Sequence, residues 1–385
     1  MNVLFLGGTG RLSKDAVTKA VSGGHNVSII TRGSKHRKQF YNNKCNCLIG
    51  DVRKPETCRQ YFNSSQRYDV IVDFLSIGVH DIKTTLSMID GSFVQYIFIS
   101  SATVFKRGAD EIIDEKSEKG NSLWQYAYNK YLCEEWLKDY YKGRKDSYYT
   151  IVRPYVTYGN TRVPYPLVPR DTLMEWSFIE RIRNGQSIPT FDNGQTITAL
   201  LNTKDFSYLL VGLFGNVKAY NNDFIIADED SVSWGEVLDT LAKVLNTTVK
   251  KVDLPKEKIF SCAPEYEPVL NGDKGINIKF DITKIKSIVP GYEKTVSLEN
   301  GLREMVSFYD ANPQLKRIDY CWNGKLDKML KKYGVHDAYK YHFSALKDFF
   351  CYLSGRFKIC DIMVSALLRG KYVVEVFWHR AKRRG

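Results

Sequence analysis

The sequence predicts an α/β protein with a doubly wound parallel sheet, a smaller C-terminal α/β lobe and a basic helical tail. The apolar run Val3–Leu6 leads through a glycine-rich turn into an amphipathic stretch, Ala16–Val21, and a second apolar run, Val27–Ile30, follows. This order is that of a strand–helix–strand crossover, in which parallel strands are buried under helices. With 385 residues and 43% apolar content, the chain is long enough for a large core.

Further short apolar runs continue the pattern along the first half of the chain. We expect strands at Cys47–Ile49, Tyr68–Phe74, Tyr96–Ile99 and Tyr149–Val152, and a helix from Tyr126 to Leu137. The carboxyl ends of such strands line the crevice in which this architecture binds its ligand. Residues that directly follow these strands are therefore candidates for the site.

The glycine-rich turn Gly7–Ser13 predicts a phosphate-binding site. Glycine permits a tight turn and lets the backbone approach a pyrophosphate at a helix N-terminus, where free N–H groups and the helix dipole favour anions. The spacing is G-x-x-G-x-x-S counted from Gly7, so Ser13 stands where the more common pattern has a third glycine. The expected ligand is a dinucleotide.

A catalytic group is predicted where hydroxyl side chains follow a strand and precede a Y-x-x-x-K helix. Ser101 follows the strand at 96–99, and Tyr126 and Lys130 lie on the helix after it. Residues four apart lie on one helix face, so the phenol and the ammonium share a pocket. A free phenol is a poor base at neutral pH, but an ammonium beside it favours the phenolate, and a serine hydroxyl stabilises the reacting oxygen.

The G-x-x-G turn, Ser101 and the Tyr126-x-x-x-Lys130 motif together resemble the extended short-chain dehydrogenase/reductase superfamily, in its NAD-dependent epimerase/dehydratase branch that modifies sugar nucleotides. The segment Arg153–Gly159 is similar to the R-P-x-x-x-Y-G motif of that family. The resemblance implies a Rossmann domain at 1–160, a substrate lobe at 161–310 with segments that return to it, and a basic, aromatic extension at 311–385. It also implies a homodimer that pairs through the Tyr126 helix.

The resemblance implies a set of site residues. Catalysis is assigned to Ser101, Tyr126 and Lys130. Cofactor contacts are expected from Gly7, Thr9, Gly10, Arg11, Leu12, Thr31, Arg32, Asp51, Val52, Phe74, Leu75, Ser76, Ser100, Tyr126, Lys130, Pro154 and Tyr155. Substrate contacts are expected from Ser101, Thr103, Tyr158 and Arg181, and no metal site is expected.

The end of the second strand bears on the choice of cofactor. An acidic residue there binds the ribose 2′-hydroxyl of NAD in this architecture. Thr31 occupies that position, and the planar guanidinium of Arg32 beside it suits a 2′-phosphate. The sequence thus favours NADP slightly over NAD.

The residues after Ser101 bear on the reaction. The 4,6-dehydratases of the family carry Asp-Glu there, whereas this chain has Ala102-Thr103, similar to UDP-galactose 4-epimerase. We expect an epimerase that works through a keto-sugar intermediate with Tyr126 as acid and base; the alternative is an NADPH-dependent reductase of a keto-sugar nucleotide. Thr198 stands where many relatives place an arginine that grips the diphosphate, which leaves the substrate open.

The net charge of +13 and the pI near 9.1 suit anionic partners and raise a distant alternative, a non-catalytic RNA-binding relative. Such relatives lose parts of the catalytic set, whereas Ser101, Tyr126 and Lys130 are all present. We therefore expect a nucleotide-sugar substrate and no nucleic-acid partner.

The remaining features bear on location. The chain has no signal-peptide pattern at its start and no uncharged run long enough to span a membrane, and its eight cysteines form no C-x-x-C pair. We expect reduced thiols and a cytoplasmic protein. From Val335 onward, aromatic and basic residues interleave, which suits peripheral contact with the inner membrane face or with a membrane-bound glycan enzyme. A helical pair packed on the main body is the alternative.

Overall fold

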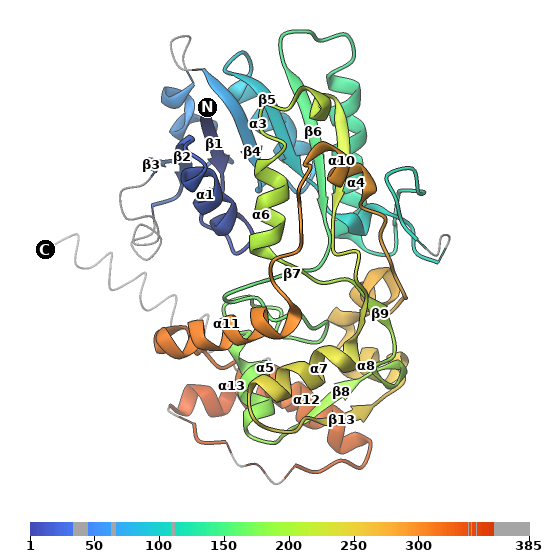
Figure 1. The fold of residues 1–385 in the computed structure, drawn as a ribbon. Coiled ribbons are helices and arrows are strands. Elements are labelled where there is room, and N and C mark those ends of the chain that lie inside the picture. Colours follow the sequence, from blue (N-terminus) through green and yellow to red (C-terminus); the bar gives the residue numbers. More distant parts are fainter. Residues whose placement is uncertain are drawn as a thin grey trace, which may run out of the picture.

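The computed structural model describes residues 1–33, 45–62, 67–108, 112–337, 339, 341–343 and 345–357. Figure 1 shows two parts, a body built on a sheet in the upper half and a lobe of helices and short strands below it. The chain passes between the two parts several times, so neither is one continuous segment of sequence.

The body contains a seven-stranded parallel sheet with the order β11-β6-β5-β4-β1-β2-β3. Its strands are β1 (Asn2–Leu6), β2 (Asn26–Thr31), β3 (Asn46–Ile49), β4 (Tyr68–Asp73), β5 (Phe93–Ile99), β6 (Tyr148–Pro154) and β11 (Asn222–Ile226). The order reverses between β1 and β4, and a crevice opens at such a switch point at the carboxyl ends of the strands. The predicted doubly wound parallel fold is confirmed.

Strand β11 is one of the segments that return from the lobe region to the sheet. It pairs in parallel with β6, with Phe224 opposite Val152. The chain thus returns from the lobe to complete the sheet, because a run buried on both faces gains more burial beside β6 than at the edge of a two-stranded sheet.

Helices cover both faces of the sheet. Side chains of β1 alternate between them: Val3 and Phe5 pack with α1 (Ser13–Ser22) and α6 (Thr203–Val211) in one core. Leu4 and Leu6 pack with α3 (Val79–Ile89) and α4 (Gln125–Tyr140) in the other. This alternation follows from the two-residue period of a strand and explains why nearly every residue of β1 is apolar.

The lobe is built from short paired strands and amphipathic helices. Its helices are α5 (Trp176–Arg183), α7 (Trp234–Val244), α8 (Lys256–Cys262) and α11 (Leu298–Ala311), whereas α10 (Thr283–Ile288) packs on the body against β11 (Figure 1). Its strand pairs are β7 (Thr157–Tyr158) with β10 (Leu201–Asn202), β8 (Ser187–Thr190) with β13 (Lys250–Asp253), and β9 (Ile197–Thr198) with β12 (Val232–Ser233).

The C-terminal extension packs on this lobe through α12 (Tyr320–Lys332) and α13 (Leu346–Arg356). The two helices cross at Gly324 and Gly355, where a Cβ atom would collide with the backbone of the other helix. The described part of the extension is therefore a helical pair seated on the lobe. Residues 358–385, on which most of the membrane-contact expectation rests, lie outside the described residues.

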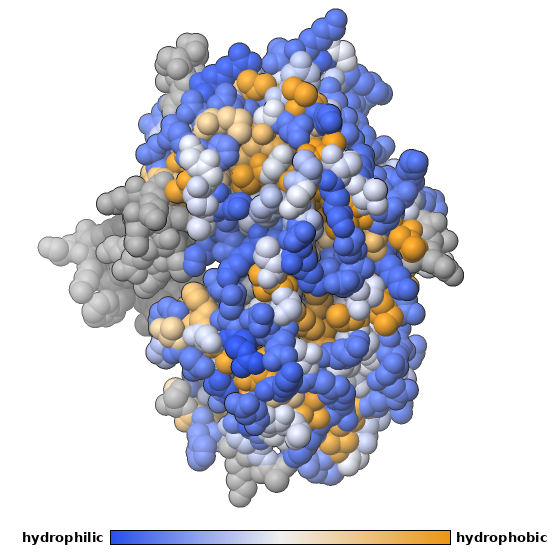
Figure 2. Space-filling view, in the orientation of Figure 1, coloured by the Kyte–Doolittle hydropathy of each residue, from blue (hydrophilic) through white to orange (hydrophobic). Residues whose placement is uncertain are grey.

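Hydrophilic side chains cover most of the face seen in Figure 2, in both the body and the lobe, with small apolar areas between them. Among the described residues, no helix combines the length and apolar character that crossing a membrane requires.

Candidate active site

The glycine turn is held by Ser13. Its hydroxyl donates to the Gly7 carbonyl at 2.6 Å and accepts the Gly10 amide at 2.9 Å, so it ties the two ends of the turn together. Gly7 has a φ of 85° and lies against Leu75, whose Cδ2 would be 2.6 Å from an added Cβ. The missing third glycine is thereby explained, because this turn uses a side-chain bridge in its place.

Several predicted cofactor residues meet beside this turn. Val52, Leu75 and Ser76 line a cavity of about 160 Å³ at the carboxyl ends of β3 and β4. Because Leu75 also packs against Gly7, the cavity adjoins the glycine turn. The turn and the cavity together form one continuous surface at the switch point of the sheet.

This surface fits a dinucleotide. The first amides of α1 have no partner within the helix. The glycines of the turn before it lack a Cβ atom and leave the backbone open to an approaching pyrophosphate. The cavity lined by Val52 and Leu75 supplies an apolar wall for a base or a ribose. Thr31 is buried at the end of β2, with the exposed Arg32 beside it.

Other predicted cofactor residues are arranged around this surface. Thr9, Gly10 and Leu12 lie in the glycine turn. Phe74 follows β4, where its ring stacks on Phe5 with centroids 6.3 Å apart. Asp51 accepts the Arg53 amide at 3.1 Å in a local turn.

The residues predicted to be catalytic come together at the carboxyl ends of β4 and β5. Lys130 is buried, and its ammonium donates to the carbonyls of Ser76 at 2.6 Å and Ile99 at 2.7 Å. Tyr126 lies one helical turn earlier on α4, and its hydroxyl has no hydrogen-bond partner in the described part of the chain. The ammonium is thus fixed at the strand ends, while the phenol remains free for a substrate.

Ser101, Thr103 and Tyr126 line a second cavity of about 300 Å³. The hydroxyl of Thr103 donates to that of Ser101 at 2.9 Å, which leaves the Ser101 proton free to donate in turn. The structure therefore gathers the predicted serine, threonine and tyrosine at one cavity, with the predicted lysine behind them.

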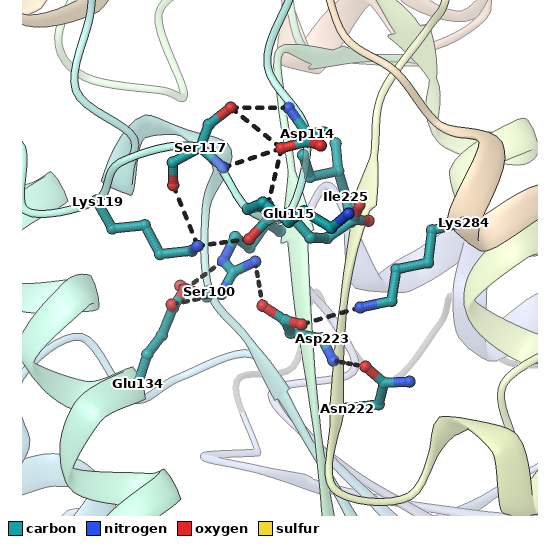
Figure 3. Close-up of polar contacts among 12 residues, drawn as sticks. Ser100, Asp114, Glu115, Ser117, Lys119, Glu134, Asn222, Asp223, Ile225 and Lys284 are labelled. Atoms are coloured by element: carbon teal, nitrogen blue, oxygen red, sulfur yellow. Dashed lines mark hydrogen bonds and ion pairs between the residues drawn. The ribbon is translucent and has the colours of Figure 1, made fainter. Parts of the chain in front are cut away.

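A buried ion network anchors α4 to the sheet (Figure 3). Arg153 on β6 donates to both Glu134 oxygens, at 2.9 and 2.8 Å, and pairs with Asp223 at 2.7 Å. Burial alone lowers the pKa of Arg153, but the two carboxylates raise it above its ordinary value. Glu134 lies one turn beyond Lys130 on α4, so this network fixes the position of the catalytic helix.

The network corrects the expected role of Ser100. Its hydroxyl donates to Glu134 at 2.5 Å in the interior and is thus directed away from the cofactor surface. The side chain of Arg11 also has another role than cofactor binding, since it pairs with Glu175 of the lobe at 2.6 Å and donates to the Thr161 carbonyl. Only the backbone of Arg11 remains for the predicted contact.

Two predicted substrate residues prove to be structural. Arg181 is buried and does not line the cavity. Its guanidinium forms hydrogen bonds and ion pairs with residues of the lobe and of the C-terminal extension. Its partners are the Ser187 carbonyl, Asn323, Asp327, Asp337 and Tyr341. Tyr158 is buried against α11, where it contacts the Gly301 position and donates to the Ser297 carbonyl at 3.3 Å.

Tyr155 has a different place from the one expected. The residue was expected to hold the cofactor through its backbone, but its amide donates to the Ile226 carbonyl at 3.3 Å. Its side chain instead lines the 300 Å³ cavity, packed on Phe280 with ring centroids 4.8 Å apart. Pro154 before it is buried at the end of β6.

Sequence reasoning missed Arg162, Arg170 and Lys274, which line the same cavity. The two arginines flank the proline-rich loop at 164–169, and a basic pair around an irregular loop next to the R-P-x-x-x-Y-G motif was an available signal. Lys274 lies in a short irregular helical segment more than a hundred residues later, so no local pattern connects it with Tyr126.

Comparisons with known proteins agree with this architecture. The model of the NAD dependent epimerase/dehydratase family matches residues 3–227. The chain is 26% identical over 283 residues to the chloroplast stem-loop binding protein of 41 kDa b of Arabidopsis thaliana, covering 67% of this chain and 69% of that protein.

Solved structures share the fold. UDP-glucose 4-epimerase from Bifidobacterium longum, solved with NAD+ and UDP, superposes with a TM-score of 0.66 at 15% identity, covering 81% of this chain and 99% of that one. dTDP-glucose 4,6-dehydratase from Bacillus anthracis, solved with NAD, gives 0.64 at 16% identity, covering 82% and 98%. Since the family model spans more than half of the residues, the chain belongs to the NAD dependent epimerase/dehydratase family.

Proposed function

We propose that this protein is an NAD(P)-dependent sugar-nucleotide epimerase that acts through a keto-sugar intermediate. The observation that carries the proposal is the shared cavity of Ser101, Thr103 and Tyr126, with the Lys130 ammonium fixed at the strand ends behind it. When bound, the dinucleotide supplies the group that accepts a hydride from a ring carbon and returns it.

The residues of the chain have separable parts in this reaction. Tyr126, as its phenolate, takes the proton of the sugar hydroxyl as the ring carbon is oxidised, and the resulting phenol gives the proton back on reduction. The Ser101 hydroxyl donates to the same sugar oxygen, and Thr103 holds Ser101 in place through its 2.9 Å hydrogen bond. The Lys130 ammonium lies one helical turn from Tyr126 and is held at the strand ends by its hydrogen bonds to the Ser76 and Ile99 carbonyls.

The residues after Ser101 favour epimerisation over dehydration. Ala102 is fully buried, and its carbonyl accepts a hydrogen bond from Arg107 at 2.9 Å. Neither Ala102 nor Thr103 offers a carboxyl group to eliminate water. A reductase that uses NADPH remains the runner-up, and Thr31 with the exposed Arg32 supports NADP slightly over NAD.

The nucleotide carried by the purified protein tests this choice. An epimerase gains by keeping its cofactor between turnovers, whereas a reductase must exchange it. We expect denatured full-length protein to release a near-stoichiometric amount of dinucleotide, identified by chromatography. A protein that purifies empty and consumes added NADPH on a keto-sugar nucleotide would establish the reductase instead.

The Arabidopsis relative supports a second candidate, because its name describes a stem-loop binding protein and this chain carries a net charge of +13. Binding of this kind depends on phosphate contacts and falls steeply as salt increases. Retention of a stem-loop RNA that falls with salt and is displaced by NADP would favour this candidate. If the RNA is retained no more than an uncharged polymer control, this candidate is excluded.

A further inference from the structure

The cavity wall opposite the catalytic hydroxyls is cationic. Arg162, Arg170 and Lys274 all line it, and none of the three forms an ion pair with a carboxylate in the described ranges. Arg162 makes one side-chain hydrogen bond, from Nη1 to the Thr157 hydroxyl at 3.0 Å. Three cationic side chains are therefore presented to a space that also holds the reacting groups.

The nearest carboxylates do not neutralise this charge. Asp273 is wholly buried and pairs with Arg107 at 2.6 Å, and Glu175 pairs with Arg11 at 2.6 Å. Each acid near the cavity already has its own arginine. Asp273 and Glu175 still act on Lys274 electrostatically, but among the described residues no carboxylate forms an ion pair with the three cations, and a bound anion would compensate their charge.

The surroundings of Lys274 disfavour its charged form. Burial lowers the pKa of Lys274 to about 8, and the positive charges of Arg162 and Arg170 act in the same direction. The negative charges of Asp273 and Glu175 oppose this shift. A bound anion would restore the charge of this lysine, because an opposite charge favours the protonated form.

Tyr155 and Asp273 also line this cavity. Their polar ends face one another: burial raises the pKa of Tyr155, and the charge of Asp273 beside its hydroxyl raises it further. The three cations are therefore the polar groups of this wall that are presented to a ligand.

We propose that the cavity binds a sugar unit carrying an oxyanion, a carboxylate or a phosphate ester, which Arg162 and Lys274 hold beside Tyr126. This inference rests on the proposed function and specifies its substrate. A volume of about 300 Å³ has room for a sugar unit. The cations and the phenol line the same space, so an anionic group on the reacting unit would lie within reach of the cations.

Ligand-observed NMR titration of the full-length protein tests the proposal with three probes, D-glucuronate, D-glucose 6-phosphate and D-glucose. We expect at least one acidic sugar to bind tenfold or more tightly than glucose, and the comparison of the two identifies carboxylate or phosphate as the preferred oxyanion. The preference should weaken as pH rises above about 8, where Lys274 loses its proton.

Substitutions of Lys274 test whether this residue carries the preference for acidic sugars. Lys274→Met should reduce the preference at least fivefold, and Lys274→Arg should keep it and remove its loss above pH 8. Lys279→Met, an exposed lysine five residues later, is the matched control and should behave as wild type. Equal binding of acidic and neutral sugars, or an unchanged preference in Lys274→Met, overturns the proposal.

Failure of this inference is distinct from failure of the proposed function. Tyr126→Phe removes only the proton-transfer group and should retain the preference for acidic sugars. A protein that shows the preference but no turnover refutes the epimerase proposal alone. Turnover that depends on Tyr126, with no preference for acidic sugars, refutes the substrate assignment alone.

Discussion

Lys274 is a residue at which binding and stability conflict. Its folded-state pKa of about 8 lies below the ordinary 10.5, so the unfolded chain binds more protons between these two values. The stability of the protein therefore rises as pH increases through this interval, and the penalty is fully present at pH 7. At 1.36 kcal/mol per pKa unit the penalty is at most about 3 kcal/mol, and partial exposure to solvent reduces it.

Lys274→Met should accordingly raise the free energy of unfolding at pH 7, by about 1 to 3 kcal/mol. Urea unfolding at pH 7 and at pH 10.5 measures it, and the gain should shrink at the higher pH, where the wild-type lysine is neutral in the folded state and half neutral in the unfolded chain. A loss of stability in the variant at pH 7 would show that the ammonium has a stabilising partner and would argue against a free cationic wall.

Tyr126→Phe removes the hydroxyl that transfers the proton and nothing else. We expect turnover to fall by about 10²-fold or more, the usual contribution of general acid–base catalysis, with dinucleotide affinity within a few-fold of wild type. Lys130→Met should weaken both, because the ammonium also ties the ends of β4 and β5 together. Tyr128→Phe on the same helix is the control and should be active.

At the scale of elements, the position of α4 depends on its buried carboxylate. Glu134→Gln leaves Arg153 with one charged partner in a wholly buried place, and breaking such a pair costs about 3 kcal/mol. Urea unfolding should show a loss of this order together with a lower kcat. Glu135→Gln, which breaks only the exposed pair with Lys138, should change stability by less than about 1 kcal/mol. Similar losses for both variants would mean that the buried network does not hold the helix.

The glycine turn is the second element with a clear test. Ser13→Ala removes the hydroxyl that joins Gly7 and Gly10, so the turn loses one or two hydrogen bonds of about 1 kcal/mol each. Dinucleotide affinity, measured by calorimetry, should fall about 5- to 30-fold. Ser22→Ala at the far end of α1 removes an exposed hydrogen bond to the Lys19 carbonyl and should have no effect on binding. Unchanged affinity in Ser13→Ala would refute the bridging role.

At the scale of the whole molecule, the sequence predicts what local patterns determine. The strands β1 to β6 follow from burial periodicity, and the spacing of Ser101, Tyr126 and Lys130 predicts that they lie close together. Which later segment completes the sheet does not follow, because strand order depends on long-range packing that a short apolar run does not encode.

The cavity wall was unpredictable for the same reason. Arg162 and Lys274 come from loops that meet only in the folded lobe, whereas Arg181, which looked like a substrate ligand, is buried by an extension whose helix α12 begins at Tyr320. An arginine near the end of a helix has the same local sequence whether a ligand or Asp327 neutralises it. Only tertiary structure separates the two cases.

The central claim is that this cavity carries out hydride transfer on a sugar nucleotide with Tyr126 as acid and base. Absorbance at 340 nm measures it most directly, with the full-length protein and its dinucleotide mixed with UDP-glucuronate or UDP-glucose. We predict a rise on mixing that is larger for the acidic sugar and absent in Tyr126→Phe. No change with either sugar, or an equal change in the wild type and Tyr126→Phe, would contradict the claim.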